Sequence, residues 1–380
     1  MKPLHEAIRR TMLFPALRLM RAQMKLISDP VHLRQLAARV DALGRQAPDV
    51  HTERVTAGTA PATWVDVAGA RRDRVVLYLH GGAFVAETPR FHGALLARIC
   101  REVGARGLMP GYRLAPEHRY PAALDDCIAA YRWLLGQGIE ASCIIVAGDS
   151  AGGNLTLALL LRARDEGLPL PAGAVALSPV ADLTFSGDSV RRNDGIDDMF
   201  SADLMDALVP VYLPQPDLCT HPHVSPVFGD YAGMPPLLLI VGSTELLLDD
   251  SVRVAQRCPG AQLLVWHGMP HVFPGFDFLP EAREATGRIG RFARECLASE
   301  PEPQAPVEAG HAARRLDAVA RFYLALAVLT GTVSLAMLAF QPAPGLGALL
   351  PGMGFGLSML LFLRRRRRGF LRSVNGRSAR

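Results

Sequence analysis

The stretch that decides the fold runs from residue 142 to residue 162 and reads SCIIVAGDSAGGNLTLALLLR. Its first part, Ser142–Ala147, is an apolar run that predicts a strand, and its last part, Asn154–Arg162, predicts a helix. GDSAG at 148–152 lies between them and fits the pattern G-x-S-x-G. A tight strand-to-helix turn with this pattern exposes the serine hydroxyl, and the glycines avoid Cβ clashes. We therefore expect Ser150 to be a nucleophile, and Asp149 to point away in a structural role.

Apolar runs and helix-length segments alternate outward from this turn, over residues 60 to about 297. Most runs from residue 74 onward are bracketed by glycine or proline, which predicts an α/β fold with a mostly parallel sheet and helices on both faces. Residues 182–234 are rich in Asp and Pro and predict an excursion from the sheet. The expected strands are Thr63–Val67, Arg74–Leu79, Arg106–Met109, Ser142–Ala147, Ala174–Leu177, Pro236–Val241 and Gln262–Trp266.

A glycine-rich loop, HGGA at 80–83, follows one of these expected strands. Such a loop can aim backbone N–H groups at the oxygen that becomes negative in a tetrahedral intermediate, and each donor contributes about 3–4 kcal/mol. We expect His80 to order the loop rather than to act as a base. The expected oxyanion hole consists of Gly81, Gly82, Ala83 and Ala151, with the N–H groups of the last three as the donors.

A serine nucleophile needs a base, and the base needs an acid that orients it. In a fold with this elbow, the acid and then the base follow the serine along the chain, each on a loop after a late strand. GSTELLLDD at 242–250 and HGMPHVF at 267–273 directly follow the last two expected strands. Both loops therefore offer the required residue types where they are required.

Each of these loops holds more than one candidate. His271 lies further into its loop than His267, which we expect simply to end the strand, so His271 is the expected base. Glu245 lies nearest the end of its strand and is the expected acid. Asp249 and Asp250 are expected to cap or begin the next helix, although Asp249 stays open as an alternative acid. Such a triad needs no metal and no organic cofactor.

Several segments together resemble the bacterial hormone-sensitive-lipase-like esterases, family IV of the α/β-hydrolase superfamily. GDSAGGN at 148–154 resembles the family's nucleophile motif residue by residue, and HGGAF at 80–84 looks like its oxyanion motif. The resemblance spans roughly residues 60–297. It is also carried by YRLAPEHRYP at 112–121, AALDDCIAAYRWL at 122–134, Ser225-Pro226, PPLLLIV at 235–241 and the region 268–273.

The resemblance implies an α/β-hydrolase fold, with a catalytic domain at 48–298 that hydrolyses carboxylic esters. It implies Glu245 as the acid, although many members read Asp-Pro-Leu where this chain reads Glu-Leu-Leu. It also implies a helical cap formed by residues 1–47 and about 182–234. Candidate residues for an acyl pocket in this cap are Met199, Phe200, Leu204 and Tyr212, with ordinary cap packing as the alternative.

The first 47 residues predict a basic amphipathic helix that is broken near Pro15 and Pro30. A helix that covers the core fits the cap role that the family resemblance implies. A helix on a membrane surface is the alternative. The segment lacks the unbroken apolar region of a secretory signal peptide.

The sequence changes character after the catalytic domain. Residues 299–311 predict a linker, because SEPEPQAPVEAG at 299–310 has no hydrophobic face. Within 312–380, Phe322–Phe340 and Gly345–Leu363 are each 19 residues long and carry no charge. A 19-residue helix spans roughly 29 Å, close to the hydrocarbon core of a bilayer. We expect a two-helix transmembrane hairpin here, with a buried helical hairpin as the alternative.

Arginines flank the expected hairpin on both sides, with the densest run at Arg364–Arg368. The positive-inside rule then places both ends of the hairpin, and with them the catalytic domain, in the cytoplasm. The net charge of +5 is a property of this tail, because removing the eight arginines at 364–380 leaves 33 basic against 36 acidic residues, or −3. No nucleic-acid partner is therefore expected. The six scattered cysteines are expected to be free thiols.

The sequence as a whole predicts a serine carboxylic-ester hydrolase that cleaves short- to medium-chain acyl esters through an acyl-enzyme intermediate. A membrane lipid hydrolase or deacetylase and an acyltransferase are the alternatives, because they need the same triad. A non-catalytic ligand-binding protein on this fold is disfavoured, since all three triad residue types are present. The expected partners are a small-molecule or lipid ester and the membrane.

Overall fold

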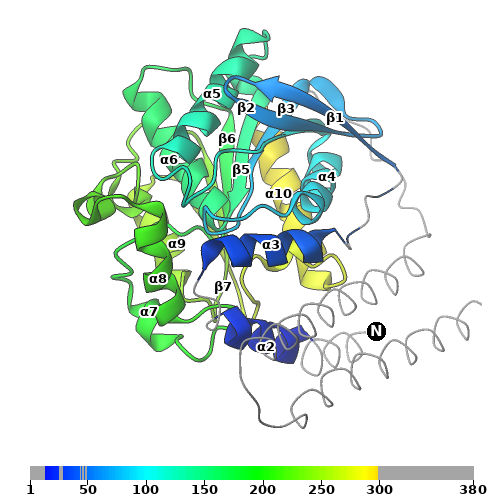
Figure 1. Cartoon of the computed structure of the whole chain (residues 1–380). Coiled ribbons are helices and arrows are strands. Elements are labelled where there is room, and N and C mark those ends of the chain that lie inside the picture. The colour runs from blue at the N-terminus through cyan, green and yellow to red at the C-terminus, as the bar shows by residue number, and fades with distance from the viewer. Residues whose placement is uncertain (1–12, 25–28, 43, 45–46, 48, 298–380) are drawn as a thin grey trace, which may run out of the picture.

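The computed structural model describes residues 13–24, 29–42, 44, 47 and 49–297 (Figure 1). Its centre is an eight-stranded sheet with the order β1-β2-β4-β3-β5-β6-β7-β8. Strands β1, β2 and β4 pair antiparallel at one edge, and the pairs from β4 to β8 are parallel. The strands are β1 Val50–Ala57, β2 Ala60–Val67, β3 Arg71–Leu79, β4 Ala105–Pro110, β5 Ile144–Asp149, β6 Gly173–Leu177, β7 Leu237–Gly242 and β8 Gln262–Trp266.

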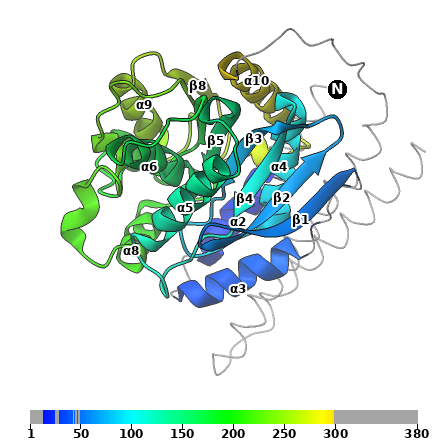
Figure 2. The ribbon, with the colours of Figure 1, turned by 90° about the horizontal axis from the view of Figure 1, so that it is seen from above.

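The central strands β5, β6 and β7 are buried on both faces, because their side chains alternate between hydrophobic cores on the two sides of the sheet. In β5, Ile144 and Val146 face one core while Ile145 and Ala147 face the other. Helices α5 and α6 cover the first face and α4 and α10 cover the second, as the view from above shows (Figure 2). The helices are α4 Pro89–Val103, α5 Ala122–Gly136, α6 Ala151–Asp165, α9 Leu248–Arg257 and α10 Pro280–Cys296. The predicted α/β fold with a mostly parallel sheet is thereby confirmed.

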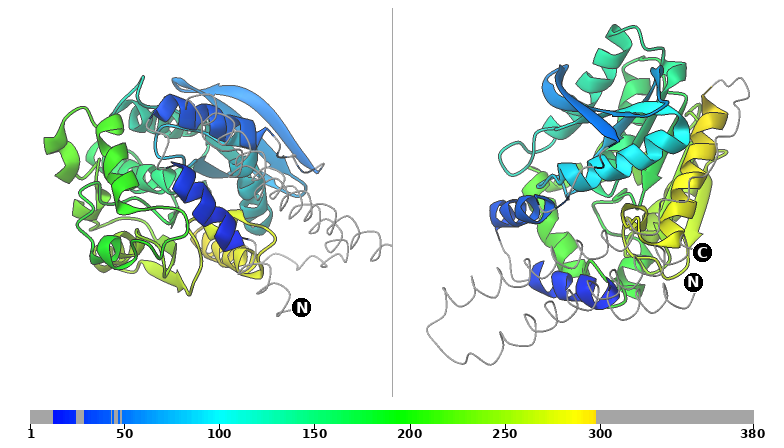
Figure 3. Two further views of the ribbon diagram at one scale, coloured as in Figure 1. Left: turned by 60° about the horizontal axis from the view of Figure 1, so that its bottom comes forward. Right: turned by 90° about the vertical axis from the view of Figure 1, so that its right-hand side faces the viewer.

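Four further helices gather at one end of the molecule, and we call them and their loops the cap (Figure 1). Two come from the N-terminal region, α2 Phe14–Met24 and α3 Pro30–Asp41, and two from the segment between β6 and β7, α7 Asp188–Arg192 and α8 Ala202–Tyr212. Pro30 begins α3, where the missing N–H costs nothing, and the carboxylate of Asp29 accepts a hydrogen bond from Val31 N–H. Figure 3 shows the two N-terminal helices lying next to this later segment.

Two expected elements differ from the structure. Strand β1 has no counterpart among the expected strands, because most of its residues are exposed at the sheet edge and it lacks an apolar run. The expected strand Ser142–Ala147 begins two residues too early, because Ala141–Cys143 forms a short 3-10 turn. The true strand extends to Asp149 and so ends directly before Ser150.

The expected linker at 299–311 and the expected hairpin at 312–380 lie outside the described residues. Within the described ranges, every helix is too short or too polar to cross a bilayer. All six cysteines fall inside those ranges and are free thiols, as predicted.

Candidate active site

Ser150 occupies the sharp turn between β5 and α6. Its backbone has φ +54° and ψ −118°, a strained conformation for a residue with a side chain. Gly152 permits this turn, because a Cβ at that position would lie only 1.9 Å from the carbonyl oxygen of Leu79. The N–H of Ser150 donates to Leu177 O at 2.8 Å, which ties the turn to the neighbouring strand. The fold therefore holds Ser150 on a strained elbow at the first turn of a helix.

Glu245 and His271 are brought together from the loops after β7 and β8. His271 Nδ1 lies 2.8 Å from Glu245 Oε2, and both side chains are almost fully buried. The other carboxylate oxygen, Oε1, accepts hydrogen bonds from Ser178 Oγ at 2.8 Å and from the N–H of Gly242 at 2.5 Å. Three donors thus fix the carboxylate, and the histidine is oriented by a fully engaged acid.

A loop after β6 connects this pair to Ser150. Val180 N–H donates to the carbonyl of Ser150 at 3.2 Å, and Ser178 Oγ accepts from Val272 N–H at 3.2 Å, next to His271. The Nε2 atom of His271 is buried and makes no hydrogen bond within the described part of the chain. That nitrogen can therefore accept or donate a proton.

The electrostatics of His271 suit a general base. Burial disfavours its protonated form, but the hydrogen bond and charge of Glu245 outweigh burial and raise the pKa of His271 above its ordinary value. The competing residues lie elsewhere: the side chain of His267 is exposed, and Asp249 accepts a hydrogen bond from Ser189 N–H at 2.8 Å. Asp249 lies in the first turn of α9, as the sequence predicts.

The glycine-rich loop at residues 80–83, which we call the oxyanion loop, has the positive φ angles that such a loop needs. Gly82 has φ +122° and Ala83 has φ +53°. The N–H groups of Gly82, Ala83 and Ala151 make no hydrogen bonds among the described residues, so they can receive a substrate oxygen. The N–H of Gly81, which was not among the expected donors, donates to Asp149 Oδ1 at 3.0 Å.

Asp149 anchors the loop to the elbow, a link that the sequence did not predict. Its Oδ1 also accepts the Tyr78 hydroxyl at 2.7 Å, and its Oδ2 lies 3.3 Å from His92 Nε2. The carboxylate crowds Gly81 so closely that a Cβ there would lie 2.2 Å from Oδ2. Burial would raise the pKa of Asp149, but His92 and Tyr78 hold it below its ordinary value. One buried carboxylate therefore fixes both the nucleophile turn and the oxyanion loop.

His80 is neutral and locally bonded. Burial lowers the pKa of His80 to about 4, and its Nδ1 lies 2.8 Å from Gly81 O. Its ring stacks on Tyr112 with centroids 4.2 Å apart, and the Tyr112 hydroxyl donates to His80 O at 2.7 Å. These contacts agree with the ordering role that the sequence predicts for His80.

A family model described as an alpha/beta hydrolase fold matches residues 76–275, more than half of the chain. The chain belongs to the α/β-hydrolase family. The matched range contains Ser150, Glu245, His271 and the oxyanion loop.

Relatives of this α/β hydrolase include esterases. An esterase of Acinetobacter venetianus is 38% identical over 231 residues, which are 60% of this chain and 76% of that protein. An acetyl-hydrolase of Streptomyces hygroscopicus is 40% identical over 246 residues, 63% of this chain and 81% of that protein. The crystal structure of an esterase from the bacterial hormone-sensitive lipase family has 38% identity and a TM-score of 0.70, and the match covers 75% of this chain and 99% of that one. The predicted resemblance to this group of esterases is confirmed.

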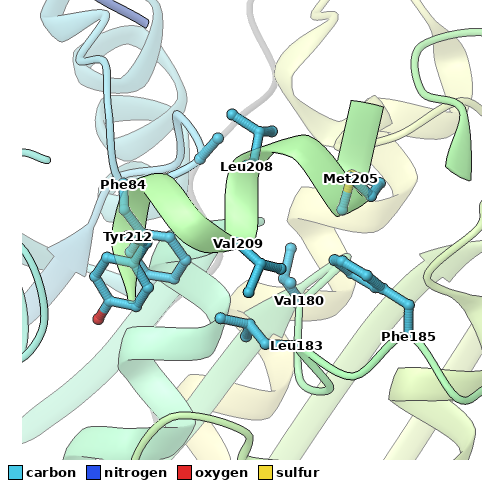
Figure 4. A pocket seen from close by; sticks show the side chains of 9 residues that line it. Phe84, Val180, Leu183, Phe185, Met205, Leu208, Val209 and Tyr212 are labelled. Atoms are coloured by element: carbon cyan, nitrogen blue, oxygen red, sulfur yellow. The ribbon is translucent and has the colours of Figure 1, made fainter. Parts of the chain in front are cut away.

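An apolar pocket opens beside the oxyanion loop of this hydrolase. Four of its residues come from one face of α8, and Figure 4 shows the rings of Phe84 and Tyr212 against each other on one side and Phe185 on the other. Those two stacked rings have centroids 3.7 Å apart. The pocket is lined by Ala83, Phe84, Val180, Leu183, Phe185, Met205, Leu208, Val209 and Tyr212.

Of the four candidate residues for an acyl pocket, Tyr212 lines this apolar pocket and the other three do not. Residues 205, 208, 209 and 212 share one face of α8 at helical spacing, and Leu204 lies outside that set. Phe200 instead packs edge-on against the His271 ring, with centroids 4.8 Å apart. Met199 packs against the second core. The face of α8 that lines the pocket depends on how the helix packs on the catalytic domain, and the residue composition does not reveal this packing.

Proposed function

We propose that Ser150, His271 and Glu245 form the catalytic triad of a serine hydrolase that cleaves short- and medium-chain carboxylic esters. Hydrolysis of a carboxylic ester agrees with the family and with the esterases among its relatives. The observation that carries the assignment of residues is the buried hydrogen bond between His271 Nδ1 and Glu245 Oε2, in a site that also holds the strained serine.

The first half of the proposed reaction forms an acyl-enzyme. His271 Nε2 removes the hydroxyl proton as Ser150 Oγ attacks the ester carbonyl carbon, and Glu245 stabilises the resulting imidazolium. The N–H groups of Gly82, Ala83 and Ala151 bind the negative oxygen of the tetrahedral intermediate. The intermediate collapses as His271 gives its proton to the departing alcohol, which leaves the acyl group on the serine.

The second half frees the enzyme. His271 removes a proton from a water molecule, the hydroxide attacks the acyl carbonyl, and the serine oxygen leaves with the proton from His271. The carboxylic acid is the product. If another alcohol takes the place of water, the same steps transfer the acyl group, so analysis of products formed in the presence of an added alcohol separates hydrolase from transferase.

The size of the apolar pocket supports the proposal that the acyl group of the substrate is of limited length. Each buried methylene contributes about 0.8 kcal/mol, or about fourfold in kcat/KM, until the pocket is full. With p-nitrophenyl esters of increasing chain length, kcat/KM is expected to rise over short acyl chains and then fall at long ones. Val209→Trp fills the pocket and is expected to move the optimum to a shorter chain.

The matched control is Leu204→Trp, on the same helix but outside the pocket lining, and the optimum is expected to stay in place. A flat dependence on chain length, or equal shifts in the two variants, would exclude this pocket as the acyl site.

We also propose that the chain is attached to the cytoplasmic membrane through residues 312–380, with the catalytic domain in the cytoplasm. The sequence supports this proposal through its two uncharged stretches of 19 residues and the arginines around them. The full chain is expected in the membrane fraction after alkaline washing, whereas a chain ending at residue 311 is expected in the supernatant with its esterase activity intact. A truncated chain that stays with the membrane would move the attachment to the N-terminal region.

A further inference from the structure

The loop between α7 and α8 holds a buried carboxylate that the proposed mechanism does not use. Asp197 is only 2% exposed, and its side chain accepts hydrogen bonds from three backbone N–H groups. Two of them belong to its own loop, Met199 at 2.8 Å and Phe200 at 3.0 Å. The third belongs to Leu246, at 2.9 Å, on the loop after β7. Asp197 therefore joins the cap to the loop that carries the triad acid.

The same loop holds the main chain on both sides of the acid side chain. Leu246, which Asp197 binds, directly follows Glu245 in the chain. The side-chain amide of Asn193 donates to the carbonyl of Glu245 at 2.7 Å and lies 3.3 Å from Ser243 O. The acid is thus held from the cap as well as from its own strand.

The loop also reaches the base. Phe200, whose N–H is held by Asp197, presents its ring to the imidazole of His271 at 4.8 Å and an interplanar angle of 81°. A single carboxylate therefore fixes the residue after the acid and the ring that packs on the base.

The N-terminal helix α2 secures this loop from outside. Arg21 donates to the carbonyl of Asp197 at 2.5 Å and lies 3.4 Å from Phe200 O. Arg18 donates to Asp198 at 2.7 Å. These contacts join residues about 180 positions apart in the sequence, and Figure 3 shows α2 against the rest of the cap.

Three carboxylates act on His271 from different elements. Glu245 acts from the loop after β7, Asp197 from the cap and Asp149 from the end of β5, and all three raise the pKa of His271 against the effect of burial. Asp197 is itself affected by burial and by the charge of Glu245, which raise its pKa. The guanidinium of Arg21 faces the main chain of Asp197 rather than its carboxylate.

We propose that Asp197 is a positioning residue of the triad, which holds the Glu245 loop and the Phe200 ring so that the acid and the base stay aligned. This inference rests on the proposed function of Glu245 and His271. Asp197 would contact neither substrate nor reacting atoms, and it acts through the main chain of Leu246 and through its negative charge.

The test is Asp197→Asn, assayed as kcat/KM against pH with a short-chain p-nitrophenyl ester. The amide cannot accept at both ends. With its oxygen toward Met199 and Phe200 it loses the hydrogen bond from Leu246 N–H, and kcat/KM on the plateau is expected to fall about tenfold. His271 must be neutral to act as a base, and removing a nearby negative charge lowers its pKa, so the acidic limb of the profile is expected to move to lower pH.

The matched control is Asp198→Asn, which removes the same charge one residue away, where the carboxylate faces Arg18. Its acidic limb is expected to coincide with that of the wild type. If Asp197→Asn loses activity while its acidic limb stays in place, or if Asp198→Asn moves the limb equally, the positioning role is wrong.

Asp197→Ser covers the case in which Asp197→Asn does not fold, because the smaller neutral side chain keeps one acceptor and is expected to move the limb in the same direction. Thermal unfolding and circular dichroism establish that each variant is folded before it is assayed. Assay of the wild type distinguishes failure of the proposed function from failure of the inference about Asp197. A wild type that hydrolyses no ester overturns the proposed function, whereas an active wild type with an unmoved limb in both Asp197 variants overturns this inference alone.

Discussion

Ser150→Ala is expected to lower kcat/KM for ester hydrolysis by about a millionfold and to abolish labelling by a fluorophosphonate probe. Without the hydroxyl, no acyl-enzyme can form, and the oxyanion donors alone give only a small residual rate. The measurement is fluorescent labelling of the purified protein on a gel, followed by hydrolysis of a p-nitrophenyl ester.

Ser142→Ala is the matched control, because Ser142 lies just before the same strand but is exposed and bonds only to Glu140 within the described residues. It is expected to keep full labelling and activity. Equal labelling of wild type and Ser150→Ala would remove Ser150 from the mechanism.

The backbone turn at residue 150 is expected to stay unchanged in Ser150→Ala. Alanine has the same Cβ as serine, and the strained φ of +54° is imposed by the strand before it, the helix after it and the bond from its N–H to Leu177. The melting temperature of Ser150→Ala is therefore expected to match that of the wild type, which separates lost chemistry from lost folding.

Glu245→Gln is expected to lower kcat by about ten-thousandfold. A glutamine that keeps its oxygen toward Ser178 and Gly242 turns its NH2 group toward His271 Nδ1. The histidine must then accept at Nδ1 and carry its proton on Nε2, which is the wrong tautomer for a base. The loss of charge also removes the stabilisation of the imidazolium.

Asp249→Asn decides between the two acids that the sequence left open. Asp249 bonds to Ser189 and lies 3.3 Å from Arg192, so its amide variant is expected to keep kcat within about threefold of the wild type. Retained activity in Glu245→Gln together with loss in Asp249→Asn would move the acid role to Asp249.

The general fold could be predicted because its signals are local. Buried parallel strands read as short apolar runs, so β5 to β8 were recognised to within about two residues. Strand β1 could not be predicted from the sequence, because an edge strand that is exposed along most of its length needs no apolar run. The position of β1 in the sheet depends on its pairing with β2, and the sequence carries no local signal of that pairing.

The candidate triad followed from chain order and the ends of strands. The residues that position the triad could not be predicted from the sequence, because their roles depend on contacts between distant segments. Ser178 could have been suggested by its position just after β6, at the same sheet edge as the nucleophile. Nothing in the sequence around Asp197 marks it as a neighbour of Leu246, 49 residues later.

The hydrogen bond between Asp149 and Gly81 of the oxyanion loop means that positions 81 and 149 constrain each other in the evolution of this enzyme. A Cβ at position 81 would collide with the carboxylate of Asp149, so the loop residue cannot gain a side chain while that acid stays in place. A library that randomises only residues 80–84 would therefore lose most of its functional members at position 81. Exploring new loop sequences requires varying residues 81 and 149 as a pair.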